Sequence, residues 1–231
     1  MAGRLRYLIC LFVLGAMTKA RAEAPAAGVR HLSFTVFSAQ PITGLMYRAR
    51  MDAASSPIDF YPTARSPDYD YQGPASVCFW DGASGRIVAE VTVPLGITSA
   101  LFLFAASGSV DGGARYQVRV LDDGLRSHAA GELRVLNYSG LNLSGTINRK
   151  RVMLPDGSAL SPQVGRSADI LLRAPFKDKS FQAYAETIPV GETGRALLIL
   201  LPPYRPGALE VQSRLLLDAP AVTPQKMPGG K

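Results

Sequence analysis

The sequence predicts an all-β protein made of two tandem β-sandwiches. Three observations support this: short apolar runs separated by turn residues, the lack of an apolar stripe at helical spacing over more than two turns, and a similarity between the two halves of the chain. Of the 231 residues, 47% are hydrophobic, and 22 are glycine and 17 proline. Such a chain can bury a core but has too many turn residues for long helices, which excludes disordered, collagen-like and coiled-coil proteins.

Each half contains short strand patterns bounded by turns. In the first half we expect strands near 31–38, 44–50, 57–61, 75–80, 86–93, 99–106 and 114–122; in the second, near 132–138, 143–148, 150–154, 168–173, 180–188, 195–201 and 208–217. Asp81-Gly82 and Asp156-Gly157 are typical hairpin turns. Seven short strands in roughly 95 residues suggest a sandwich of immunoglobulin-like size, here present twice. A single larger sandwich assembled from both halves is the alternative.

The similarity between the halves is clearest where residues 94–123 are aligned with 189–218 at a constant offset of 95. The identities include Pro94/Pro189, Gly96/Gly191, Thr98/Thr193, Leu103/Leu198, Gly112/Gly207, Gln117/Gln212, Arg119/Arg214 and Asp123/Asp218. Roughly two identities are expected from average residue usage. The starts of the halves, from Leu32 and Leu133, align less sharply at an offset of 101. The chain therefore reads as an internal duplication.

Residues 1–22 read as a secretory signal peptide. Arg4 and Arg6 precede an apolar run from Leu8 to Met17, and Ala20-Arg21-Ala22 fits the small-residue cleavage pattern. A run of about ten apolar residues is roughly half of what a membrane-spanning helix needs, so an uncleaved anchor is the less favoured alternative. We therefore expect a secreted or periplasmic protein without stable membrane insertion after cleavage.

The expected domains follow from these patterns. They are a signal peptide over 1–22, a first sandwich over 23–125, a second over 126–219 and a disordered tail over 220–231, with a linker near Gly124–Gly131.

The formal charge of +7 would suit a nucleic-acid-binding protein, but four of the 25 Lys and Arg residues precede residue 23 and no acid does. Without them, 21 basic residues stand against 18 acids. We therefore expect no nucleic-acid partner.

The residue types that carry catalysis are scarce. His31 and His128 are the only histidines, and we expect both in solvent, at a strand end and in the linker. Cys78 is the only cysteine after the leader, and we expect it buried as a small hydrophobe, without a disulfide. One cysteine and two distant histidines cannot form a closed zinc site, and no common nucleophile motif occurs. Asp122-Asp123 is explained by turn formation before a glycine. We expect no cofactor, no metal and a non-enzymatic protein.

The locally unusual segment is Ser56–Pro74, which holds four aromatic residues among four prolines. Aromatic rings on a rigid loop suit stacking on a glycan or anchoring a protein partner. The alternative is that the rings cover the edge of the sandwich. Asp68 and Asp70 within the segment suggest a second function, a polysaccharide-directed enzyme or accessory module. The candidate binding residues are Phe60, Tyr61, Asp68, Tyr69, Asp70 and Tyr71.

Two further motifs have two interpretations each. Arg149-Lys150-Arg151, followed by an apolar Val152-Met153-Leu154, would suit an anionic polymer or lipid surface, or is a solvated turn. Asn137-Tyr138-Ser139 and Asn142-Leu143-Ser144 match the glycosylation acceptor pattern, which matters only in a eukaryotic secretory route.

The run from Arg134 to Gly140 (RVLNYSG) and the later Pro189-Val190-Gly191 resemble the entry strand and the pre-strand turn of a loose group of uncharacterised secreted bacterial β-sandwich proteins. The resemblance implies export and a β-sandwich, and it carries no catalytic residues. Periplasmic pilus chaperones are similar in size and two-sandwich layout, as a fold-level analogy only. We expect an exported binding or structural module whose ligand is a protein or glycan.

Overall fold

The computed structural model describes residues 28–61, 63–107 and 115–218, and it is all-β there, as predicted. The expected signal peptide, its cleavage after Ala22 and the tail over 220–231 lie outside the described residues. Sixteen strands form four sheets, and no helix occurs in the described part. It follows that these residues contain no helix long and apolar enough to cross a membrane.

Eight strands belong to each half. The first half contains β1 (Arg30–Ser38), β2 (Leu45–Arg48), β3 (Ser55–Pro57), β4 (Tyr69–Gly73), β5 (Ser76–Asp81), β6 (Ile87–Thr92), β7 (Ser99–Ala106) and β8 (Tyr116–Asp122). The second contains β9 (Leu133–Asn137), β10 (Leu143–Ile147), β11 (Lys150–Leu154), β12 (Ala159–Leu160), β13 (Ser167–Phe176), β14 (Lys179–Pro189), β15 (Arg195–Leu201) and β16 (Gln212–Asp218).

The two halves repeat one strand order. The first half forms the sheets β4-β1-β7-β8 and β3-β2-β5-β6, and the second forms β12-β9-β15-β16 and β11-β10-β13-β14. Adding eight to each strand number of the first half gives the second, including the parallel pairs β1/β7 and β9/β15. In a constant-type immunoglobulin sandwich the first strand pairs with the second, whereas here it lies between the fourth and the seventh.

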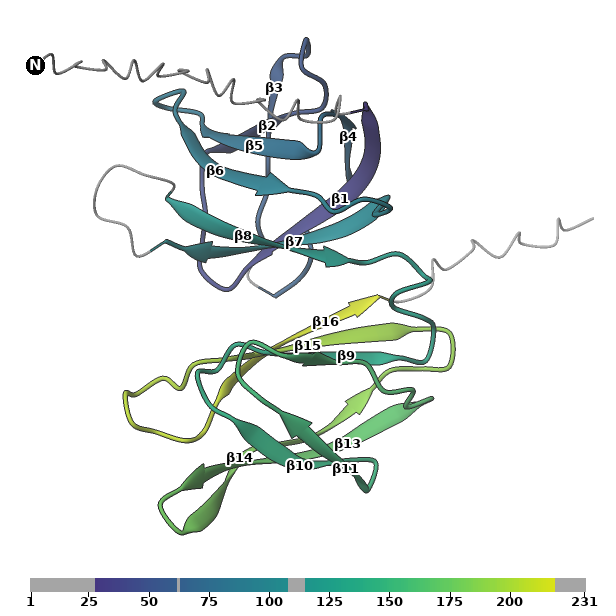
Figure 1. The fold of residues 1–231 in the computed structure, drawn as a ribbon, viewed down its shortest axis with the longest axis vertical. Coiled ribbons are helices and arrows are strands. Elements are labelled where there is room, and N and C mark those ends of the chain that lie inside the picture. The colour runs from purple at the N-terminus through teal and green to yellow at the C-terminus, as the bar shows by residue number, and fades with distance from the viewer. Residues whose placement is uncertain (1–27, 62, 108–114, 219–231) are drawn as a thin grey trace, which may run out of the picture.

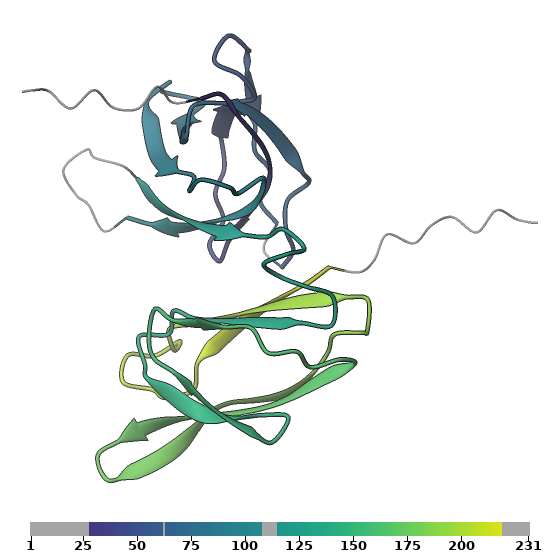
Figure 2. The same cartoon turned by 45° about the vertical axis from the view of Figure 1, so that its right-hand side comes forward.

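Each half has its own apolar core between its two sheets (Figures 1 and 2). Phe34, Phe79 and Phe102 fill the first core, and Leu133, Leu172 and Leu198 fill the second. All six side chains are at most 1% exposed. Since no sheet contains strands from both halves, the single larger sandwich is not what forms.

The predicted strands are found near their expected places, with two additions. β4 and β12 were not expected, and both pair with the first strand of their half. β4 lies inside the segment that the sequence suggested was a loop. β3 covers Ser55–Pro57 rather than 57–61.

The register corrects the alignment of the halves. Arg119 of β8 pairs with Leu103 of β7, whereas Arg214 of β16 pairs with Ile199 of β15. If equivalent residues of β8 and β16 differ by 95 in number, those of β7 and β15 must therefore differ by 96. Leu103 is therefore equivalent to Ile199 and not to Leu198. The physical reason is the two-residue period of a strand: a shift by one residue moves each side chain to the other face. At the start of the halves the equivalent offset is 99 rather than 101, because Phe34 pairs with Ala100 and Leu133 with Ala196.

A third apolar cluster joins the halves. The sheets β4-β1-β7-β8 and β12-β9-β15-β16 face each other across it (Figure 1). The first half contributes Phe37, Leu101 and Leu103, and the second contributes Leu136, Leu197, Ile199 and Leu216. These residues alternate along their strands with core residues, so β7 and β15 are apolar on both faces, whereas β1 and β9 each add one apolar residue to the cluster.

Candidate functional site

The aromatic residues of the predicted binding segment lie mostly in the core of the first half. Tyr71 is 8% exposed, and its hydroxyl donates to the carbonyls of Pro74 and Ser76, both at 3.1 Å. The ring of Tyr69 lies 5.4 Å from that of Phe34.

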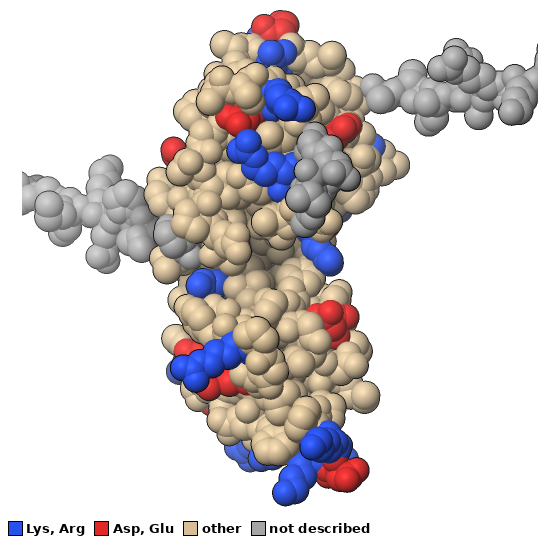
Figure 3. All heavy atoms as spheres, turned by 90° about the vertical axis from the view of Figure 1, so that its left-hand side faces the viewer, with Lys and Arg blue, Asp and Glu red and all other residues tan. Residues whose placement is uncertain are grey.

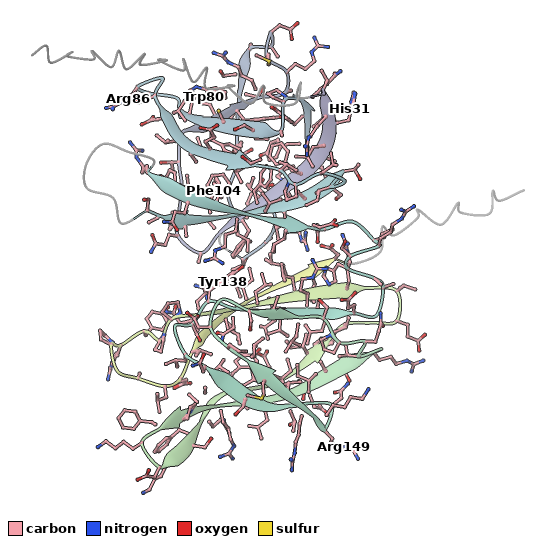
Figure 4. All side chains as sticks on the ribbon, in the orientation of Figure 1. His31, Trp80, Arg86, Phe104, Tyr138 and Arg149 are labelled. Atoms are coloured by element: carbon pink, nitrogen blue, oxygen red, sulfur yellow. The ribbon has the colours of Figure 1, made fainter. Side chains whose placement is uncertain are left out.

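The other two aromatics of the segment differ from each other. Phe60 contacts Phe104 edge-on at 5.3 Å between ring centroids, and Phe104 lies inside the first half (Figure 4). Tyr61, by contrast, is 45% exposed.

The expectation that several of these rings present open faces together is therefore wrong. Tyr69 and Tyr71 alternate with Asp70 and Gln72 along β4, so the rings turn to the core and the polar side chains to solvent. Asp68 and Asp70 are exposed, and Asp70 lies on the opposite face of β4 from the two tyrosine rings. Within the described residues no three His, Cys, Asp or Glu side chains group as metal ligands.

The two histidines differ from each other. His31 is exposed in β1, as expected for a strand end (Figure 4). His128 is wholly buried, which corrects the expectation of a solvated linker residue. Its Nε2 lies 3.1 Å from the carbonyl oxygen of Ala196, and its Nδ1 lies 3.5 Å from Oδ1 of Asp123.

Cys78 is half-buried on the outer face of β5 rather than in the core. Its neighbours Val77 and Phe79 take the buried positions instead. Burial, with a contribution from Glu90, raises the pKa of the Cys78 thiol. The thiol is therefore less reactive than an exposed one.

Asn137 and Asn142 also have different environments. Asn137 is fully buried, and its Nδ2 donates to the carbonyls of Leu141 and Leu154, both at 2.8 Å. Its Oδ1 accepts a hydrogen bond from the Ser139 hydroxyl at 2.6 Å. In the folded chain Asn137 has no surface at which a glycan fits, whereas Asn142 is exposed.

An ion network occupies one end of the contact between the halves. Asp123 at the end of β8 and Asp218 at the end of β16 both pair with Arg65 and Arg195, and His128 lies against Asp123. Arg65 Nε lies 3.0 Å from Asp218 Oδ1, and Arg195 Nη2 lies 2.8 Å from Asp218 Oδ2. These five side chains are termed the interface ion network below.

The carboxyl group of Asp123 is the most enclosed acid of this network, with a side chain 8% exposed. Burial alone raises its pKa, but the close approach of His128 and the charges of Arg65 and Arg195 outweigh that effect and hold the pKa below its usual range. Asp122 does serve the turn, since its Oδ1 accepts a hydrogen bond from the Gly124 N–H at 3.0 Å. Turn formation thus explains Asp122 but not Asp123.

A groove opens at the other end of the same contact, with a volume of about 610 Å³. We call it the inter-sandwich groove. Its apolar base includes Phe37, Leu103 and Ile199, which belong to the cluster that joins the halves. Figure 3 shows the surface hollowed between the two halves.

Polar side chains from both halves line the inter-sandwich groove. Gln117 and Arg119 extend from β8, and their equivalents Gln212 and Arg214 extend from β16. The guanidinium group of Arg119 lies 4.6 Å from the ring centroid of Tyr138, which lies between the halves (Figure 4). The glutamine and arginine residues that are identical between the two halves on these strands therefore line one surface.

The groove keeps an excess of positive charge. Within the described part of the chain, no carboxylate oxygen lies within 4 Å of Arg119 or Arg214. Arg214 donates to the carbonyl of Ser213 at 2.7 Å. Asp156 is the acid that lines the groove, and its Oδ1 accepts a hydrogen bond from the Gly140 N–H at 2.9 Å.

The sequence contained a signal for this groove. Gln117 and Arg119 alternate with Tyr116, Val118 and Val120, and the same polar pair recurs in the second half. Polar residues on the outward face of two equivalent strands suggest that the two strands contribute to one surface. What this face contacts depends on how the halves pack.

Comparison with protein-family models finds no match to this chain, and comparison with curated proteins finds none.

Proposed function

We propose that this chain is an exported, non-enzymatic binding protein that holds an amphipathic anion in the inter-sandwich groove. The observation that carries the proposal is that Arg119 and Arg214, from equivalent positions in the two halves, line one cavity with an apolar base. Export rests on the signal peptide expected over residues 1–22.

The chemistry of the lining selects this class of ligand. A carboxylate, phosphate or sulfonate accepts charge-assisted hydrogen bonds from a guanidinium group, and these are stronger than neutral ones. The apolar base at Phe37, Leu103 and Ile199 suits a hydrocarbon or ring that follows the anionic group. A volume of about 610 Å³ lies within the range of small-molecule sites.

A binding role is also supported by the residue types in the groove. Among the described residues, its lining contains no histidine, cysteine or lysine. The Oγ of Ser38 accepts a hydrogen bond from the Gln40 N–H at 3.2 Å, and among the described residues no histidine or carboxylate is hydrogen-bonded to this hydroxyl.

We also propose, from the repeated strand order, that the chain arose by internal duplication. The two immunoglobulin-sized domains are then 23–125 and 126–219. The segment Gly124–Gly131 connects them and supplies His128 to the interface ion network.

The binding proposal is tested with 8-anilinonaphthalene-1-sulfonate, which combines aromatic rings with one sulfonate. The wild-type protein should bind it saturably, one molecule per chain. Because each charge-assisted bond contributes roughly 1.5–3 kcal/mol, the R119Q/R214Q variant should bind at least tenfold more weakly. Dodecanoate should displace the probe, and an uncharged alkyl glucoside should not.

The matched control is R48Q/R86Q, which removes two exposed arginines from the first half and should leave the affinity unchanged. The probe also binds partly unfolded proteins, so all three proteins must show the same melting temperature. Equal affinity of wild type and R119Q/R214Q would contradict the assignment of the groove. Absence of saturable binding to the wild type would contradict the function.

A further inference from the structure

The second half carries the basic excess of the described chain. Between residues 125 and 218 there are twelve Lys and Arg against eight Asp and Glu, whereas residues 28–124 contain seven against nine. The two halves share one fold, so this difference reflects their surfaces. Part of the excess lies on the sheet β11-β10-β13-β14, on the side away from the groove.

The strand register places cationic and apolar side chains next to each other on the outer face of that sheet. Ser144 pairs with Met153 on one side and with Arg173 on the other. One pair further along, Thr146 pairs with Arg151 and with Leu171. Arg151, Met153, Leu171 and Arg173 are termed the basic sheet face.

This face is open and shallow. A hollow of about 610 Å³ is bordered by the four side chains of the basic sheet face and has Ser144, Gly145 and Thr146 at its base. Met153 is 81% exposed, which is unusual for a large apolar side chain on a regular strand. In the part of the chain that the structure describes, no carboxylate lies within 4 Å of Arg151 or Arg173.

The hairpin turn next to this face adds further cations. Asn148 and Arg149 have φ angles of 48° and 64°, which shape a tight turn between β10 and β11. Arg149 extends away from the body of the second half (Figure 4), and Lys150 beside it is also exposed. The turn and the basic sheet face together present four cations on one hairpin and its neighbouring strand.

We propose that the basic sheet face docks on an anionic phospholipid surface. Arg151 and Arg173 contact lipid phosphates above the small hydroxyl residues Ser144 and Thr146, and Met153 enters the boundary between headgroups and acyl chains. Combined apolar burial and electrostatic attraction is how peripheral proteins bind such surfaces. A soluble polyanion would satisfy the arginines equally, but it would leave Met153 in water. The proposal is independent of the ligand in the groove.

The test is co-sedimentation of the purified protein with vesicles at low ionic strength. Vesicles of phosphatidylglycerol and phosphatidylcholine should bind the wild type, and pure phosphatidylcholine vesicles should not. Each basic residue near the surface strengthens binding by about fivefold, so R151Q/R173Q should bind roughly 25-fold more weakly. M153A should bind several-fold more weakly, because it removes the apolar contact.

The control is R48Q/R86Q, which removes the same charge from the first half, with Arg48 on β2, the strand equivalent to β10. It should bind within about twofold of the wild type, and all variants should keep their melting temperature. No binding of the wild type to anionic vesicles would overturn the proposal, as would an equal loss in the control. Unchanged vesicle binding of M153A would contradict the entry of Met153 into the acyl-chain boundary. Binding to dextran sulfate with no binding to vesicles would assign the face to a soluble polyanion instead.

Discussion

At the scale of single residues, Asp123 shows how a side chain near a turn becomes structural. Its carboxylate faces Arg65 and Arg195, whose side chains are 11% and 17% exposed. Three charged groups at such low exposure are stable only as a set, because each unpaired buried charge is costly. The network therefore constrains how the two halves meet.

Replacing Asp123 by alanine should be strongly destabilising. It leaves Arg65 and Arg195 with Asp218 as their remaining carboxylate and removes the acceptor beside His128. Breaking a buried pair costs about 3–5 kcal/mol, measured as the free energy of unfolding by denaturant. D52N is the control, because the Asp52 side chain is 79% exposed and its change should cost less than about 0.5 kcal/mol. Similar losses in both variants would contradict the network's role.

At the scale of elements, alternation in the sequence predicted most strands, and its limits have physical causes. Strand β4 was missed because prolines bracket it, although Tyr69-Asp70-Tyr71-Gln72 alternates as a half-buried strand does. The same prolines favour a binding loop for the aromatic residues, whereas the strand turns Tyr69 and Tyr71 to the core. Strand β12 has two residues, which is too short for any periodic signal.

The interior of β10 contains a position that only glycine fits. A Cβ built on Gly145 would lie 1.9 Å from the carbonyl oxygen of Leu171 in β13, and that oxygen cannot move without disturbing the strand pair. G145A should lower the stability by about 2–3 kcal/mol, seen as a melting temperature lower by roughly 5–10 °C. S144A, at the neighbouring exposed position, should melt within about 2 °C of wild type. A stable G145A would show that β10 and β13 separate more easily than their pairing suggests.

At the scale of the whole molecule, the identities on β8 and β16 share one location. Gln117/Gln212 and Arg119/Arg214 line the groove, Leu121 and Leu216 lie in the apolar cluster between the halves, and Asp123/Asp218 belong to the interface ion network. Core positions between them differ, as with Val120 and Leu215.

The sequence predicted that these strands were related, but not that their outer faces meet. That contact depends on the packing of two separately folded sandwiches, which no local pattern encodes. A duplication in which each copy packs against the other explains why the similarity lies on this face.

The interface ion network predicts how the stability of the molecule depends on pH. The pKa of Asp123 is lower in the folded chain than its unfolded value of about 3.9. At acidic pH the folded state therefore binds fewer protons at Asp123 than the unfolded state does. Its contribution is therefore complete above about pH 4 and is lost as the pH falls through the folded pKa. Protonation of Asp123 removes the carboxylate that faces the guanidinium groups of Arg65 and Arg195, so both are then poorly paired.

The measurement is thermal unfolding of wild type and D123N from pH 7 to pH 2. Other carboxylates titrate in both proteins, so the network appears as the difference between the two curves. That difference should be constant from pH 7 to about pH 4 and should shrink below it, because the wild type then loses the charge that D123N already lacks. Two curves that stay parallel to pH 2 would show that the Asp123 carboxylate does not stabilise the contact between the halves. The groove at the other end would then depend on the apolar cluster alone.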